Sequence, residues 1–121
     1  MSPPRTFCEL LERYQRGERN FAGAALDTDP DNDLSSVCLD GADLSGSFLV
    51  ASFRRASLRD VRFHQANVKT CDFREADLCG ADFSGAALCG ALFSGANLEG
   101  ARFAGAHFHS HVFAEGELPC G

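Results

Sequence analysis

A large apolar residue recurs at every fifth position from Phe48 to Leu118, through fifteen consecutive positions. Ala or another small residue lies two positions before most of them. A period of five matches neither the 3.6-residue period of an α-helix nor the two-residue alternation of a β-strand. Only a chain that turns a corner every five residues can bring all of these positions to one inner surface. The sequence therefore predicts a repeat architecture of stacked coils.

The clearest units read ADLSG at 42–46, ADLCG at 76–80, ADFSG at 81–85 and ANLEG at 96–100. In these units the chain resembles the pentapeptide repeat proteins, whose unit is usually written A(D/N)LXX. The resemblance implies an all-β fold, a right-handed quadrilateral β-helix with four units per coil. The central Leu or Phe and the preceding small residue would point inward. The resemblance implies no activity, since similar members include many of unknown function, abundant in cyanobacteria, and a longer subset that mimics DNA and binds type II topoisomerases.

Twenty residues per coil also predict which inward side chains stack. One face would hold Phe53, Phe73, Phe93 and Phe113, and the next Leu58, Leu78, Leu98 and Leu118. A narrow coil has room for these side chains only if a small residue shares each layer. Leu44 and Phe48 are four residues apart, which predicts a one-residue deletion near Gly46.

The fifth place of the unit should form the corners of the coil. Gly fits there because a type II turn needs a positive φ. Between Phe53 and Arg74 the corner place holds Arg55, Asp60, Gln65 and Thr70. We expect some of these corners to use another turn type.

The N-terminal segment differs from the repeats. Apolar residues at 7, 10, 11 and 14 follow the spacing of an amphipathic helix, Thr6 and Glu9 form a capping-box pattern, and Gly17 is a natural stop. We interpret residues 5–17 as a helix that covers the apolar end of the first coil. A helix that docks on a partner is the alternative. The predicted organisation is an N-terminal capping helix (1–20) and a β-helix (21–121) in one domain, with a solvated loop at 27–33.

The charges of the chain and their positions indicate which kinds of partner it can bind. The net charge is −6, and the chain has neither an apolar stretch long enough to span a membrane nor a signal-like N-terminus, so we expect a cytoplasmic protein without a membrane partner. Six cations lie close together in the sequence: Arg54, Arg55, Arg59, Arg62, Lys69 and Arg74. They either form solvated charge ladders, such as Arg62–Asp82–Arg102, or recognise an acidic partner protein. The negative overall field argues against direct nucleic-acid binding.

Cysteines and histidines raise a second question. Cys71 falls at an inward small-residue place, and Cys79 and Cys89 fall on opposite faces, so these three should be free thiols. Pairing stays open for Cys8, Cys38 and Cys120 near the ends. Coil stacking places Cys89 below His109, while His107 would share its outer face and His111 would take an inward small place. No fourth ligand is evident, so we predict no metal and no cofactor.

The pattern favours a non-catalytic protein-interaction or scaffold module with an unidentified protein partner. No catalytic residues are predicted, because no triad, phosphate loop or paired carboxylates occur. One alternative is a DNA-mimic inhibitor or protector of a type II topoisomerase. Another is a thiol- or metal-responsive binding protein using Cys89, His107, His109 and Cys120. An open apolar end at Phe113 and Leu118 would leave either a monomer or an end-to-end homodimer.

Overall fold

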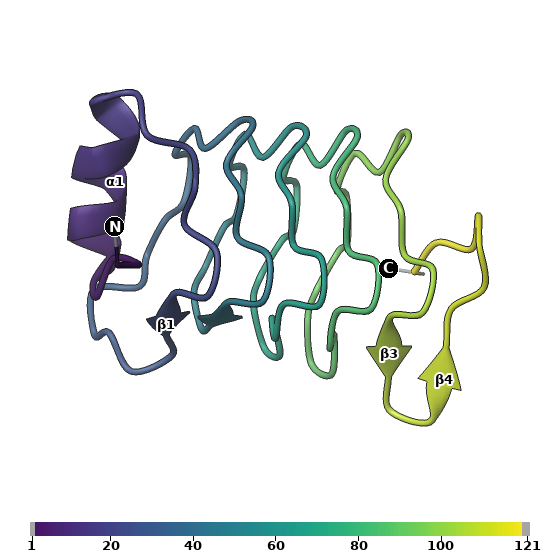
Figure 1. Cartoon of the computed structure of the whole chain (residues 1–121). Coiled ribbons are helices and arrows are strands. Elements are labelled where there is room, and N and C mark those ends of the chain that lie inside the picture. The colour runs from purple at the N-terminus through teal and green to yellow at the C-terminus, as the bar shows by residue number, and fades with distance from the viewer. Residues whose placement is uncertain (1, 120–121) are drawn as a thin grey trace.

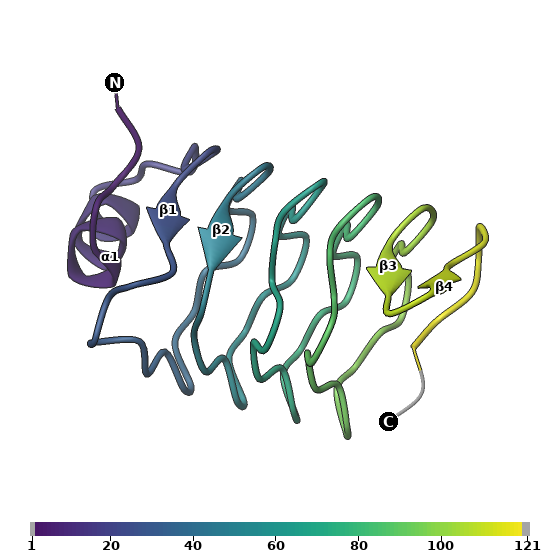
Figure 2. The same cartoon turned by 90° about the horizontal axis from the view of Figure 1, so that it is seen from below.

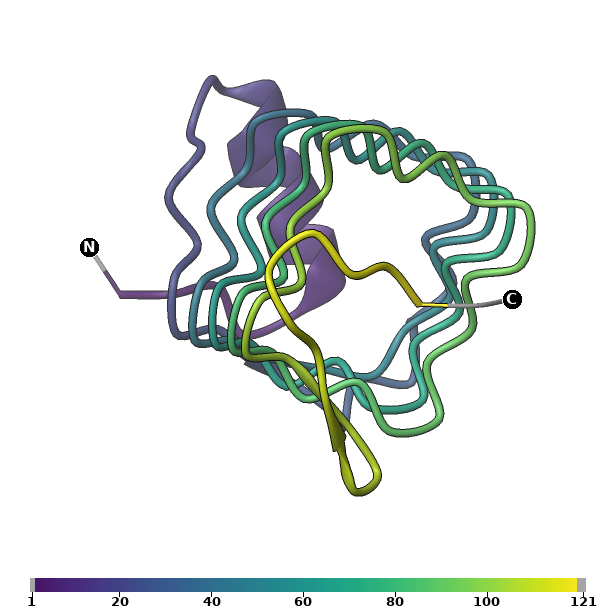
Figure 3. The same cartoon turned by 90° about the vertical axis from the view of Figure 1, so that its right-hand side faces the viewer.

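The computed structural model describes residues 2–119, which wind into a stack of coils (Figure 1). Viewed along its axis, the stack is a tube with roughly four sides (Figure 3). Each coil donates backbone hydrogen bonds in both directions. For example, Phe63 N–H donates to Asp82 O at 2.7 Å, and Asp82 N–H donates back to Val61 O at 3.0 Å. These bonds place residues about twenty apart in neighbouring coils, in agreement with the four five-residue units per coil that the family resemblance implies.

Regular strands are short because each face runs straight for only one or two residues before the next corner. β1 (Ala25–Leu26) pairs in parallel with β2 (Phe48–Leu49). The other coil-to-coil contacts are mostly single-residue parallel bridges, such as Arg62 with Asp82 and Asp82 with Arg102. The chain is therefore a β-helix in which the ladder of bridges, and not long strands, holds the coils together.

Phenylalanine rings form two columns inside the tube. Phe53 stacks on Phe73 with ring centroids 5.4 Å apart, and Phe73 stacks on Phe93 at 5.2 Å. A second column contains Phe63, Phe83 and Phe103, and neighbouring rings of the two columns meet edge to face. Ala residues at the small places are buried beside the rings. The core is thus continuous from the helix to the last coil, since each ring contacts the coils above and below.

The position of the one-residue deletion differs from the prediction. Leu49, and not Phe48, is the inward residue of its unit: Leu49 is fully buried, whereas Phe48 is 42% exposed. Ser47 takes the small place, and its hydroxyl donates to Leu44 O at 2.6 Å. The phase of Leu44 therefore continues to Leu49, and the missing residue is a corner residue after Leu49. Because two apolar residues stand side by side, the sequence pattern alone could not separate the two registers.

The corners without glycine keep the same backbone as those with it. Arg55, Asp60, Gln65 and Thr70 all have φ between 57° and 63°. Each of these corners closes with the same turn hydrogen bond, as from Cys71 N–H to Val68 O at 3.1 Å. The expectation of another turn type is therefore wrong. Stacking on neighbouring coils imposes the left-handed conformation even on a β-branched residue.

The C-terminal segment leaves the coil path earlier than the repeat pattern predicts. β3 (His107–Phe108) and β4 (His111–Val112) form an antiparallel hairpin that extends past the last coil (Figures 1 and 2). Phe113 consequently meets Phe103 edge to face at 6.0 Å and does not continue the column of Phe93. Leu118 is 44% exposed. The bulk of a histidine at position 111, where the inward place needs a small residue, accounts for the reversal.

At the other end, α1 (Phe7–Gln15) lies across the stack (Figure 1). Phe7 and Leu10 are buried in the common core, and Tyr14 Oη donates to Asp40 O at 2.8 Å. Thr6 is the N-cap and accepts from Glu9 N–H at 3.0 Å. The reciprocal half of the capping box is absent among the described residues, because the Glu9 carboxylate accepts from Arg5 N–H instead.

Candidate protein-interaction surface

Three of the six predicted cations gather at one corner of the stack. Arg54 and Arg55 share the Glu75 carboxylate, at 3.6 and 3.4 Å, and Arg74 pairs with Asp72 at 2.8 Å. We call Arg54, Arg55, Asp72, Arg74 and Glu75 the charged corner. The Arg74 guanidinium, which also donates from Nε at 3.0 Å, holds the pKa of Asp72 below its usual value. Each of the three guanidinium side chains is at least 40% exposed, so the corner presents its charge to solvent.

The other three cations lie elsewhere around the stack. Arg59 is at the next corner and reaches Asp77 at 3.7 Å. Arg62 is on the following face, and Lys69 is two corners beyond Arg59, next to Thr70. Neither Arg62 nor Lys69 makes an ion pair within residues 2–119. The six cations therefore encircle the coils, and only the charged corner brings several of them together.

A shallow polar groove lies on the face that carries Arg62. The predicted column of Arg62, Asp82 and Arg102 is present as successive backbone bridges. The groove encloses about 430 Å³, and its corner side is open because Gly80 and Gly100 have no side chains there. Within the described chain, no ion pair shorter than 4 Å links these three residues, so the column is solvated and contributes little stability.

The C-terminal end carries an apolar hollow of about 430 Å³. Phe113 and Leu118, the predicted end-contact residues, both line it, although Phe113 is buried and only Leu118 is substantially exposed. The sequence reading missed Leu92, which also lines the hollow and is 43% exposed. The repeat pattern itself contains a signal for Leu92. In the unit ALFSG at 91–95, Leu92 occupies the second place, where Asp or Asn is usual and where the side chain points outward.

The cysteines and histidines do not converge on one site. His109 N–H donates to Cys89 Sγ at 3.2 Å, which confirms the predicted stacking of these two residues. His111 is exposed and pairs with Glu117 at 2.7 Å, so the inward placement predicted for it is wrong. Within residues 2–119 no three potential metal ligands lie close together, and Cys120 falls outside the described residues.

The described cysteines, which are Cys8, Cys38, Cys71, Cys79 and Cys89, are free thiols. Cys71 occupies the inward small place as predicted, and its thiol lies 3.3 Å from Leu49 O. Burial raises the pKa of Cys71 to about 12. This thiol is therefore a packing element, because its reactive thiolate form is strongly disfavoured.

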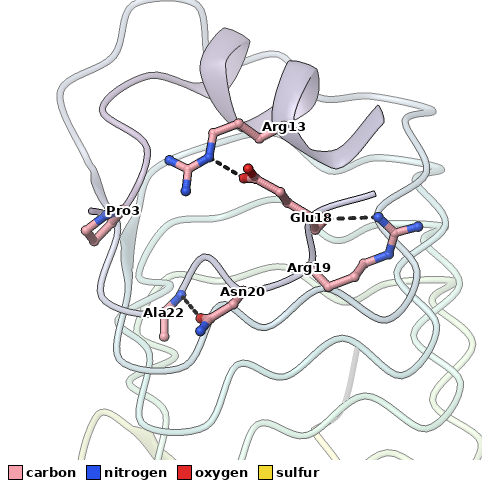
Figure 4. A pocket seen from close by; sticks show the side chains of 6 residues that line it. All are labelled: Pro3, Arg13, Glu18, Arg19, Asn20 and Ala22. Carbon is pink, nitrogen blue, oxygen red and sulfur yellow. Dashed lines mark hydrogen bonds and ion pairs between the residues drawn. The ribbon is translucent and has the colours of Figure 1, made fainter. Parts of the chain in front are cut away.

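A further hollow, of about 460 Å³, lies between α1 and the first coil (Figure 4). Arg13 from α1 and Glu18 from the following segment meet at its wall, and Arg19 donates to Glu18 O at 2.9 Å. Asn20 at its floor accepts from Ala22 N–H at 3.1 Å. Arg13, Glu18, Arg19 and Asn20 thus each make at least one hydrogen bond to another residue that lines this hollow. A membrane-spanning helix is absent from residues 2–119.

Comparisons with known proteins agree with this architecture. A family model described as Pentapeptide repeats matches eight copies over residues 51–74 and 71–109, and the match stops where the chain reverses at the hairpin. No curated protein gives a significant match. The crystal structure of alr5209, a pentapeptide repeat protein from Nostoc Pcc 7120, is 37% identical, with a TM-score of 0.50 over 88% of this chain and 82% of that one.

QnrB1, a plasmid-mediated fluoroquinolone resistance protein, is 21% identical, with a TM-score of 0.58 over 73% of this chain and 52% of its own length. At that identity the likeness concerns the fold alone, and this chain spans about half of QnrB1. A thylakoid-lumen pentapeptide repeat protein from Arabidopsis thaliana is 33% identical over 65% of this chain and 66% of that one, with a TM-score of 0.43. The repeat sequence, the stacked coils and the relationship to alr5209 together show that this chain belongs to the pentapeptide repeat family.

Proposed function

We propose that this chain is a non-catalytic interaction or scaffold module whose charged corner binds an acidic segment of a partner protein. The observation that carries the proposal is the gathering of Arg54, Arg55 and Arg74 at one exposed corner. The Glu75 side chain is itself 50% exposed, and Asp72 accepts from the Arg74 guanidinium through Nε and Nη2. An incoming carboxylate can therefore exchange with Glu75, which holds both of its arginines at more than 3.3 Å.

The backbone supports this role by fixing the spacing of the outward side chains. The arginines at 54, 55 and 74 lie in adjacent coils that are joined by Arg55 N–H to Arg74 O at 3.1 Å. Coils in such a ladder repeat at roughly 4.8 Å. A rigid array of this kind needs little ordering when a partner binds, which favours affinity.

Affinity capture with two matched triple variants tests the proposal. The first carries Arg54→Glu, Arg55→Glu and Arg74→Glu, and the control carries Arg62→Glu, Lys69→Glu and Arg102→Glu, which changes the net charge equally. We expect a protein retained by the wild type to be lost from the first variant and kept by the control. Equal loss from both would indicate non-specific electrostatic attraction, and retention by both would rule out the charged corner.

We also infer that α1 acts as an end cap, so that the helix and the β-helix form one domain. Its buried Phe7 and Leu10, and the hydrogen bond from Phe7 N–H to Asp29 at 2.8 Å, support this role. A chain without residues 2–16 should then expose the first coil and aggregate. A shortened chain that stays monomeric and folded would favour a helix meant for a partner.

The two alternative functions that the sequence suggests, a DNA mimic and a thiol- or metal-responsive protein, each have a separate test. A DNA mimic should alter supercoiling by DNA gyrase, and no effect at a large molar excess would remove that hypothesis. A metal-responsive protein should retain zinc when purified without chelator. Loss of that zinc in a Cys89→Ser variant would identify the thiol as a ligand.

A further inference from the structure

The last coil leaves backbone groups unbonded that every earlier coil uses. On the face of the first phenylalanine column, Phe73 N–H donates to Leu92 O at 2.8 Å, and Glu75 N–H donates to Ser94 O at 3.0 Å. Leu92 N–H donates back to Cys71 O at 3.0 Å. One coil later, the equivalent groups are Phe93 N–H, Gly95 N–H and Ala91 C=O. None of these three has a partner within residues 2–119.

Up to residue 119, the chain does not pair with this edge through its own continuation. By the repeat period, residues 112–114 would lie over it. Instead Phe113 N–H donates to Ala106 O and Gly105 N–H donates to Phe113 O, both at 2.9 Å, on another part of the coil. The hairpin therefore leaves an unpaired strand edge, which we call the open edge: Ala91, Phe93 and Gly95. Such an edge is a template for an added strand.

The apolar hollow lies directly beside the open edge. Ala91, Leu92 and Phe93 line it from the last coil, and Phe113 and Leu118 line it from the C-terminal segment. In the earlier coils, the residue after each bridged residue points inward, as Phe93 follows Leu92 and stacks on Phe73. A strand added to the open edge would likewise place one side chain over Phe93, inside the hollow.

We propose that the open edge binds an extended segment of a partner protein as an added parallel strand. One residue of that segment donates to Ala91 O and accepts from Phe93 N–H, and a carbonyl two residues later accepts from Gly95 N–H. The following side chain, aromatic or aliphatic, fills the hollow. The residue preceding the bridged one is small, since the earlier coils need Ala at that place beside each ring.

A second copy of this chain fits the open edge less well than a single strand. β4 and the segment after it lie past the last coil along the axis, so they obstruct a flat approach by another last coil (Figures 1 and 2). Two chains of net charge −6 also repel each other. A single extended segment needs only one face of the coil. Leu98 and Gly100 N–H on the next face also have no backbone partner within residues 2–119, but the face at 91–95 is the one that borders the apolar hollow.

Peptide selection followed by NMR tests this proposal. A phage-displayed library of random twelve-residue peptides is selected on the full chain, and an enriched peptide is titrated into ¹⁵N-labelled protein. We expect enriched peptides to share a small residue two positions before an aromatic or aliphatic one. We also expect slower hydrogen exchange of the Phe93 and Gly95 amides by at least about tenfold, because bonded amides exchange only on opening.

Two variants of matched exposure complete the experiment. Leu92→Glu places a carboxylate in the hollow and should weaken peptide binding by at least about tenfold, because an unpaired charge is costly to bury. Phe48→Glu changes an equally exposed apolar residue far from the edge and should leave binding unchanged. The proposal is overturned if no peptide is enriched, or if an enriched peptide binds equally to both variants. It is also overturned if the chain forms a dimer without peptide in which the Phe93 and Gly95 amides already exchange hydrogen slowly. The charged corner is intact in both variants, so this site and the proposed function can fail separately.

Discussion

Arg13 donates from Nε to the Glu18 carboxylate at 2.5 Å, and only 7% of the arginine is exposed. Its Nη1 also donates to Ser2 O at 3.0 Å and to Glu9 at 3.2 Å. Its Cζ lies 5.8 Å from the centroid of the Phe21 ring. One guanidinium thus joins the N-terminal segment, α1 and the first coil.

Replacing this arginine should loosen the helix from the stack. We expect Arg13→Met to lower the urea midpoint of unfolding, because the Glu18 and Glu9 carboxylates lose their common partner while the apolar stem is kept. Arg16→Met, on the exposed side of the chain just after α1, is the control and should leave the midpoint nearly unchanged. Equal midpoints for the two variants would show that the network does not stabilise the fold.

The register at the deletion can be tested with neighbouring residues. Leu49→Ala should reduce the free energy of unfolding by about 2–5 kcal/mol, because it leaves a cavity in the core. Phe48→Ala should reduce it by less than about 1 kcal/mol, because that ring is partly in solvent. Urea denaturation of both variants measures the difference. A larger loss for Phe48→Ala would restore the register in which Phe48 points inward.

The corner at Thr70 holds a β-branched residue at φ 63°. A left-handed conformation costs a residue with a Cβ roughly 1–2 kcal/mol, so Thr70→Gly should raise the melting temperature. Gly90 lies in the coil above, at φ 80°, and a Cβ there would stand 3.1 Å from Thr70 Cγ2. Gly90→Ala should therefore lower the melting temperature. Thermal unfolding followed by circular dichroism tests the pair, and a drop for Thr70→Gly would mean that the threonine contacts outweigh the backbone strain.

The thiols should differ sharply in reactivity. Since burial raises the pKa of Cys71 to about 12, we expect iodoacetamide at pH 8 to leave Cys71 unmodified in the folded protein. Cys8 and Cys38 are exposed and should be alkylated, as should every cysteine in urea. Peptide mass spectrometry locates the modified residues. Alkylation of Cys71 at the rate of Cys38 without denaturant would contradict the buried placement.

Stability should fall in acid partly because of the charged corner. The hydrogen bond from Arg74 lowers the pKa of Asp72 in the folded state relative to the unfolded chain. Its stabilising contribution is therefore complete above the unfolded value, about pH 4, and is lost as the pH falls through the lower folded value. Asp72→Asn should lose less stability than the wild type between pH 6 and pH 3. Urea midpoints at both pH values give the comparison, and parallel losses would remove Asp72 as a cause.

The sequence by itself determined the stacked-coil architecture and most of its interior. A five-residue period is a local signal, because every unit repeats the same choice of small and large inward residue. Together with the four units per coil that the family resemblance implies, it places Phe53, Phe73 and Phe93 in one column without knowledge of distant contacts. The helix near the N-terminus is also local, since its apolar spacing and Thr6 N-cap lie within one short segment. The family follows from the same units.

Only the tertiary structure decided which of two adjacent apolar residues points inward at the deletion. Phe48 and Leu49 satisfy the pattern equally well. The choice of Leu49 as the inward residue rests on the backbone pairing of Phe48 with Ala25 and Asn67 in neighbouring coils. The corner conformation at Thr70 is likewise imposed by the coils above and below it. The repeat pattern gives the neighbours in the next coil, but it does not give the register across a deletion or the backbone conformation that these neighbours impose at a corner.

The sequence alone located the candidate surfaces less well than it located the core. The sequence showed six cations near one another, but their angular positions around the coil separate the three at the charged corner from the rest. The reversal after Phe108 was hidden, because Phe113 and Leu118 keep the repeat phase. The structure ends the coils there because His111 is too bulky for the inward place, and this leaves the edge at Phe93 and Gly95 unpaired.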